Sequence, residues 1–115
     1  MATTKQKAQK GAGVTELTGK EFQDFTKKGL VLMDFFADWC MPCLMMAPVM
    51  EELSGKMKGK IKFGKINVDD NRELSQKYRI MSIPNFILFK DGKPADQFIG
   101  SMPIEDFEER LKKHL

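Results

Sequence analysis

Two cysteines separated by two residues are the strongest sign of chemistry in this sequence. Cys40 and Cys43 stand in "DWCMPC", where an apolar strand candidate gives way to a helix candidate. A helix begins with unpaired N–H groups and the positive end of its dipole, and both favour a thiolate. We therefore expect Cys40, nearer the loop, to be a nucleophile in disulfide exchange. Cys43, one turn inward, would be the buried resolving thiol.

Other interpretations of the cysteine pair remain open at this level, inert thiols among them. A purely structural disulfide would constrain the unfolded chain little, because it closes so short a loop. A zinc site needs four ligands, and His114 is the single histidine in the sequence. A monovalent copper site would use soft sulfur atoms from nearby methionines, namely Met41, Met45, Met46 and Met50. Methionines at helical spacing usually fill a core or a binding surface, so redox exchange is the favoured interpretation.

An aspartate inside an apolar strand candidate is the second sign of chemistry. Asp34 lies in "LVLMDFF" (30–36), where an unpaired carboxylate is costly to bury and its pKa rises. We expect Asp34 to take and return the proton of Cys43 during exchange. Lys65, in the middle of another strand candidate, would be its partner. A solvent-facing Asp34, a structural ion pair and an exposed Lys65 are the alternatives.

The elements that must position these residues follow an alternating order. Apolar spacing and turn residues predict strands at 14–17, 30–36, 61–68, 85–90 and 95–100, and helices at 18–28, 40–57, 69–78 and from 104 onward. Thr18 and Glu21 have the spacing of a capping box, and Asp91-Gly92 predicts a hairpin between the last two strands. Strands connected through helices pair in parallel, so we expect a three-layer α/β domain with a mixed sheet.

Length and charge limit the other classes of protein. The chain of 115 residues is long enough for one domain at 14–115, preceded by a disordered basic arm at 1–13. That arm accounts for most of the net charge of +3, so composition gives no support for binding nucleic acid. No apolar run reaches the roughly 20 residues of a membrane helix, and because the start has no apolar core we do not expect a secretory signal. We expect a cytoplasmic monomer.

Taken together, the quoted motifs resemble the thioredoxin family. "DFFADWCMPC" is similar to that family's Asp-Phe-x-Ala-x-Trp-Cys-x-Pro-Cys pattern, and "APVMEEL", "KINVD", "SIPNFILFKDG" and "FIG" follow in the family's order. The resemblance covers residues 14 to 115. It implies a thioredoxin fold, an α/β architecture with a central mixed sheet of four or five strands flanked by four helices.

The resemblance also implies an activity, that of a protein-disulfide reductase without a bound cofactor. Its redox group would be the Cys40–Cys43 disulfide, and its partners would be disulfide-containing proteins and a flavin- or ferredoxin-linked thioredoxin reductase. Asp34, with Lys65 beside it, would be the buried proton relay. A cis peptide bond would precede Pro84, and a partner chain would add as a strand beside Ile83. The substrate-binding surface would consist of Trp39, Met41, Pro42, Ile83, Pro84 and Gly100.

Four positions depart from the family's pattern. Met41 stands where glycine is usual, and Leu44 stands where lysine or arginine is usual. Phe36 replaces a frequent tryptophan, and Asn85 replaces a frequent threonine after the proline. These changes bear on the reduction potential and on the choice of partner. A disulfide oxidase or isomerase, a copper-binding protein and a non-catalytic binding module are the alternative functions.

Overall fold

The computed structural model describes residues 13–115, so the basic arm expected at residues 1–13 lies outside the described residues apart from Gly13. Within this range, five strands alternate with four helices. The strands are β1 (Val14–Leu17), β2 (Leu30–Phe36), β3 (Ile61–Asn67), β4 (Asn85–Lys90) and β5 (Lys93–Ile99). The helices are α2 (Gly19–Thr26), α3 (Met41–Lys56), α4 (Arg72–Lys77) and α5 (Ile104–Lys112). No helix of this part of the chain combines the length and the apolar character required to cross a membrane.

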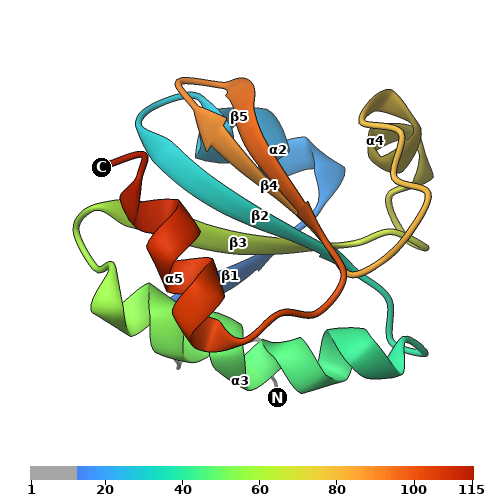
Figure 1. Cartoon of the computed structure of the whole chain (residues 1–115). Helices are drawn as coiled ribbons and strands as arrows, with labels where there is room; N and C mark the ends of the chain where they lie inside the picture. Colours follow the sequence, from blue (N-terminus) through green and yellow to red (C-terminus); the bar gives the residue numbers. More distant parts are fainter. Residues whose placement is uncertain (1–12) are drawn as a thin grey trace, which may run out of the picture.

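The strands form one mixed sheet in the order β1-β3-β2-β4-β5 (Figure 1). β3 lies parallel to both β1 and β2, whereas β4 runs antiparallel to β2 and to β5. The hairpin between β4 and β5 turns at Asp91 and Gly92, which both have positive φ angles. The predicted mixed α/β architecture with four helices is confirmed.

Each face of the sheet carries its own apolar core. Helices α3 and α5 cover one face, as Figure 1 shows, and their side chains share a cluster with Leu32 of β2. Side chains of α2 and α4 belong to the cluster on the other face, which includes Val31 and Met33. Side chains two residues apart in a strand share a face, so Asp34 points the same way as Leu32, toward α3. The central strand thus carries a carboxyl group into an otherwise apolar layer.

A break in the alternation of β3 reflects burial on both faces. Ile61 and Phe63 belong to the cluster under α3, whereas Ile66 belongs to the opposite cluster. Gly64 is buried on that opposite face, where a Cβ atom would come within 2.9 Å of the Phe25 ring. Lys65, two residues after Phe63, lies on the same face of the sheet as Phe63, the face that α3 covers. β3 is therefore a regular strand with a lysine at a core-facing position, although its apolar residues do not alternate strictly at Gly64 and Lys65.

The helix boundaries agree with the sequence except at α4. Thr18 and Glu21 form the predicted capping box, and α3 continues through Pro48 without interruption. Helix α4 starts at Arg72 instead of residue 69. The preceding residues are held in a turn because Asp69 accepts a hydrogen bond from a tryptophan and Asn71 accepts one from the backbone of α2.

Candidate active site

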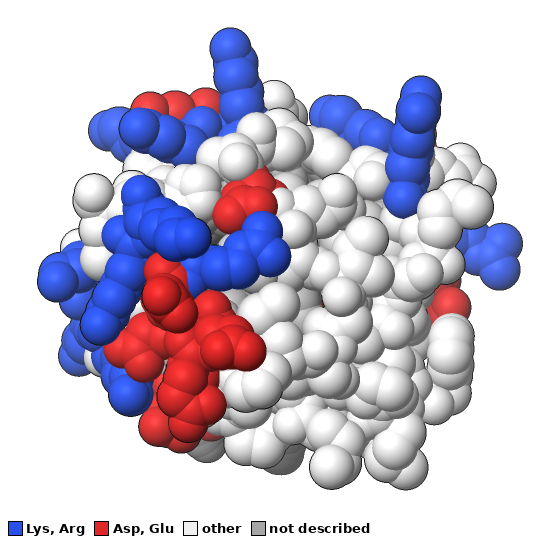
Figure 2. Space-filling model, viewed as in Figure 1, with Lys and Arg blue, Asp and Glu red and all other residues white. Residues whose placement is uncertain are grey.

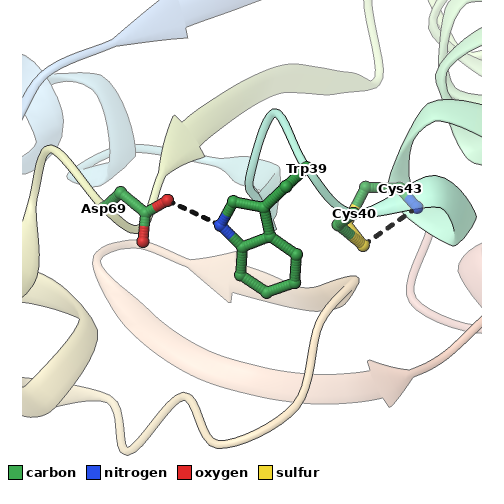
Figure 3. The surroundings of a disulfide bond; sticks show 4 residues. All are labelled: Trp39, Cys40, Cys43 and Asp69. Atoms are coloured by element: carbon green, nitrogen blue, oxygen red, sulfur yellow. Dashed lines mark hydrogen bonds between the residues drawn. A yellow bond between two sulfur atoms is a disulfide. The ribbon is translucent and has the colours of Figure 1, made fainter.

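The two cysteines form a disulfide at the N-terminus of α3. Their Cα atoms lie 5.2 Å apart, within the usual range for a disulfide. Cys40 is the N-cap of the helix, and its Sγ accepts a hydrogen bond of 3.2 Å from the backbone N–H of Cys43 (Figure 3). Met41 and Pro42 make up the start of the first turn and are exposed. The predicted junction of a buried strand and a helix start therefore carries the redox pair.

Burial does not distinguish the two cysteines, because each is only 4% exposed. Both pack with Ala37 in a small cluster that Ile83 and Val68 border. Their places in the helix do distinguish them. The sulfur of Cys40 receives an N–H at the helix terminus, where the dipole is most positive, whereas Cys43 lies within the first turn.

Trp39 lies beside the disulfide with most of its surface open to solvent. Its Nε1 donates a hydrogen bond of 2.8 Å to the carboxylate of Asp69, as Figure 3 shows. Sequence reasoning did not find Asp69, which it placed at the start of a helix. Trp39 and Asp69 follow β2 and β3, two parallel neighbours whose carboxyl ends meet at one edge of the sheet. The sequence could have indicated that Trp39 and Asp69 lie close together, because each follows one of these two strands.

A second loop reaches the disulfide from the other side. The peptide bond between Ile83 and Pro84 is cis, as the resemblance implied, and Ile83 packs against the cysteine cluster. The N–H of Gly100 donates a hydrogen bond of 2.8 Å to the carbonyl of Pro84. Gly100 has a φ of 91°, a conformation that favours glycine, and nothing lies within 4 Å of the position of an added Cβ. The fold thus brings Ile83 to the cysteine cluster, and a hydrogen bond joins Gly100 to the neighbouring Pro84.

Asp34 is buried, as its position in the strand predicted. It is 5% exposed, and its Oδ1 has no hydrogen-bond partner among the described residues. Burial disfavours the charged carboxylate and raises the pKa of Asp34 to about 7, while the positive charge of Lys65 acts in the opposite direction. Asp34 can therefore hold or release a proton near neutral pH.

Asp34 and Cys43 meet in one cleft beneath α3. The cleft has a volume of about 170 Å³, and Lys65 also lines it. A larger hollow, of about 980 Å³, lies between α2 and α4 near Asn71 and has no cysteine in its lining. The smaller cleft thus brings a buried carboxyl group and the second cysteine together.

The residues considered for metal binding do not converge. Met46 and Met50 are buried in the core under α3, whereas Met41 and Met45 are exposed. His114 follows α5, and its Nε2 is 2.9 Å from the Asp96 carboxylate. Within residues 13–115, no group of three or more His, Cys, Asp or Glu side chains could hold a metal ion.

The surface around the disulfide is apolar and weakly charged. Figure 2 shows acidic side chains gathered at the lower left, while the lower right, where α3 begins in Figure 1, is largely uncharged. The exposed large apolar residues near the start of α3 are Trp39, Met41, Leu44 and Met45. Met81, 90% exposed, adds a further thioether from the loop before Pro84. We call these five residues the apolar rim.

This fold, with a disulfide at the N-terminus of a helix beside a cis proline, defines a thiol–disulfide oxidoreductase. The sequence model of the family described as "Thioredoxin" matches residues 13–113. Over 102 residues the chain is 44% identical to a thioredoxin of Staphylococcus saprophyticus and 45% identical to one of Staphylococcus epidermidis. Both alignments cover 89% of this chain and 98% of the relative. A thioredoxin of Staphylococcus aureus is 44% identical over the same coverage.

The chain belongs to the thioredoxin family. It is a protein-disulfide reductase that works by dithiol–disulfide exchange, and the Cys40–Cys43 pair is its redox-active disulfide.

Proposed function

We propose that Cys40 is the attacking thiolate and Cys43 the resolving thiol. The observation that carries this assignment is the N-cap position of Cys40, where its sulfur accepts the N–H of Cys43 and faces the positive end of α3. In the reduced protein, the same donor and the helix dipole would stabilise a negative charge on Cys40. Cys43 has no such place at the helix terminus.

The exchange then proceeds in two balanced steps. The Cys40 thiolate attacks one sulfur of a partner's disulfide, so that a mixed disulfide forms and the partner's other sulfur leaves as a thiolate. Cys43 loses its proton and attacks the Sγ of Cys40, which releases the partner's second sulfur. The partner gains two electrons, and Cys40 and Cys43 return to the disulfide.

We propose that Asp34 takes the proton of Cys43 in the second step, with Lys65 as its charged neighbour. Three facts support this role: the shared cleft, the unpartnered Oδ1 and the raised pKa of Asp34. A base with a pKa near the working pH transfers protons efficiently in both directions.

Trp39, Met41, Pro42, Ile83, Pro84 and Gly100 are proposed as the substrate-binding surface. Support comes from Ile83, which packs against the cysteine cluster, and from Trp39 and Met41 next to the cysteines, whose exposed side chains are apolar. A partner segment in extended conformation would hydrogen-bond to the backbone of Ile83 as an added strand. The partner's own apolar side chains would contact the apolar rim, since that surface offers almost no charge to pair with.

We also propose the wider setting of the reaction. The Cys40–Cys43 pair carries the two electrons in its dithiol form, so no bound cofactor is required. A thioredoxin reductase, flavin- or ferredoxin-linked, would return the disulfide to the dithiol. Disulfide-containing proteins would be the targets, with neither nucleic acid nor membrane as a partner. A cytoplasmic monomer at residues 14–115 fits this role, because a reductant works where thiols are kept reduced.

The test is a pair of trapping variants. Cys43→Ser should accumulate a mixed disulfide with an insulin chain through Cys40, visible by mass spectrometry, because the resolving thiol is missing. Cys40→Ser should trap nothing and lose at least about 10³-fold in the rate of insulin reduction, since the activated nucleophile is gone. Trapping by Cys40→Ser and not by Cys43→Ser would reverse the assignment.

A further inference from the structure

Three charged side chains lie in one row across neighbouring strands. Lys65 of β3 is in register with Glu16 of β1 on one side and with Asp34 of β2 on the other. All three residues line the cleft beneath α3, so their side chains share one face of the sheet. Lys65 therefore stands between two carboxyl groups, one buried and one exposed.

Few other charges face Asp34. From the loop after β2, Asp38 lines the same cleft, and from α3 come Cys43 and Glu51. β4 places the uncharged Phe86 beside Asp34. Asp38 and Glu51 come from outside the sheet, so Glu16 is the one carboxylate of the cleft besides Asp34 itself that shares a strand register with Lys65.

The ammonium group of Lys65 is not committed to a single carboxylate. None of the ion pairs within residues 13–115 involves Lys65, and its Nζ lies 5.1 Å from the centre of the Phe36 ring. A lysine held by an aromatic ring between two carboxyl groups can shift its charge toward either one, because its four-carbon stem is flexible.

We propose that Glu16 is a positioning residue for proton exchange at Asp34, because its carboxylate attracts the Lys65 ammonium toward the mouth of the cleft. This inference rests on the proton role of Asp34 proposed above. Lys65 lowers the pKa of Asp34 against the larger effect of burial. When Glu16 draws that positive charge outward, Asp34 keeps its proton to a higher pH than it would beside Lys65 alone.

The charge of Glu16 would thereby affect how readily Asp34 accepts and releases a proton. A carboxyl group that is half ionised near neutral pH can accept the proton of Cys43 and then release it to solvent. A carboxyl group held ionised by a nearby ammonium would accept the same proton less readily. Glu16 thus keeps the buried acid close to the pH at which it can act in both directions.

The experiment titrates Asp34 in the full-length oxidised protein, in which neither cysteine can ionise. The carbon-13 signal of the Asp34 carboxyl group is followed by NMR against pH in the wild-type protein and in Glu16→Gln. We expect the midpoint in Glu16→Gln to fall by about 0.5 to 1 pH unit, because Lys65 can move closer to Asp34 once the carboxylate that attracts it is removed. The midpoint of the pH–rate profile for insulin reduction should move the same way.

Two matched variants separate positioning from simple loss of charge. Glu52→Gln makes the same charge change at an exposed position of α3 outside the cleft, and it should leave the midpoint in place. In a Lys65→Met background, Glu16→Gln should shift the midpoint much less, because the lysine through which it mainly acts is absent.

Three results would overturn the inference: an unmoved midpoint in Glu16→Gln, an equal shift in Glu52→Gln, or an undiminished shift in the Lys65→Met background. The NMR midpoint does not depend on activity. A wild-type protein that fails to reduce insulin would therefore contradict the proposed function while leaving the effect of Glu16 measurable.

Discussion

Two aspartates under different helices of this domain, Asp34 beneath α3 and Asp96 against α5, show how surroundings divide chemistry from stability. Asp34 lies beneath α3, buried, with Oδ1 unpartnered among the described residues. Asp96 of β5 lies against α5, where Arg110 donates to it at 2.9 Å and His114 lies at the same distance. One carboxyl group has almost no partners, and the other has several.

The difference appears in their pKa values. Burial raises the pKa of Asp34 to about 7, and Lys65 offsets this only in part. Burial also acts on Asp96, but the hydrogen bonds from His114 and Gln97 and the charge of Arg110 outweigh it, so its pKa is lowered. A carboxyl group that lacks partners costs stability and is available for proton transfer, whereas a well-paired one stabilises the fold.

The largest expected effect is at Asp34. The folded protein keeps this proton up to about pH 7, whereas an unperturbed aspartate releases it near 3.8. Stability therefore falls as pH rises between these values, by about 1.4 kcal/mol for each pH unit, or roughly 4 kcal/mol in all. Asp34→Asn has no such proton to release. Its unfolding free energy, relative to that of the wild-type protein, should therefore be several kcal/mol higher at pH 8 than at pH 4.

Urea unfolding of both oxidised proteins at the two pH values measures this change. Other titrating groups cancel in the comparison, because both proteins share them. Parallel stability curves for wild type and Asp34→Asn would contradict the raised pKa. The variant should also reduce insulin more slowly, by about 10- to 100-fold, because the proton acceptor is gone.

At Asp96 the expected change of stability with pH is smaller and has the opposite sign. Its lowered pKa contributes stability above the unfolded value of 3.8, and that contribution disappears as pH falls through the folded value. Asp96→Asn should lose about 1 kcal/mol of unfolding free energy at pH 7, the usual worth of a partly exposed ion pair, and almost nothing near pH 2. Insulin reduction should stay at the wild-type rate. A slower rate would mean that Asp96 and its partners also take part in the reaction.

The smallest effect is expected at Asp69, a third carboxylate with a single partner. Asp69→Ala removes the acceptor of the exposed Trp39 indole. Since this hydrogen bond lies at the surface, the loss of unfolding free energy should stay below about 1 kcal/mol. Fluorescence of Trp39, the single tryptophan of the sequence, should report a more mobile ring. A larger loss of unfolding free energy would mean that Asp69, like Asp96, stabilises the fold.

Much of the active site was predictable because its residues are close in sequence. Cys40 and Cys43 lie one helical turn apart, and the N-cap position of Cys40 follows from a strand that ends just before it. The burial of Asp34 was equally predictable, since six apolar neighbours surround it within one strand. Local patterns of this kind depend only on the periodicity of helices and strands.

Other parts of the site depend on contacts between distant segments. The hydrogen bond from Trp39 to Asp69 joins residues 30 positions apart, and the N–H of Gly100 meets the carbonyl of Pro84 across a hairpin. The late start of α4 has the same origin, because Asp69 and Asn71 are used by other elements. No local pattern contains these partners.

The sequence by itself therefore determined the order of the elements, the redox pair and the presence of a carboxyl group in the core. Only the tertiary structure decided what surrounds that group. Strand order and register set Glu16, Lys65 and Asp34 side by side, although nearly 50 residues separate the first from the second. Electrostatic effects depend on distance in space and on burial, and both are fixed only when the sheet and α3 come together.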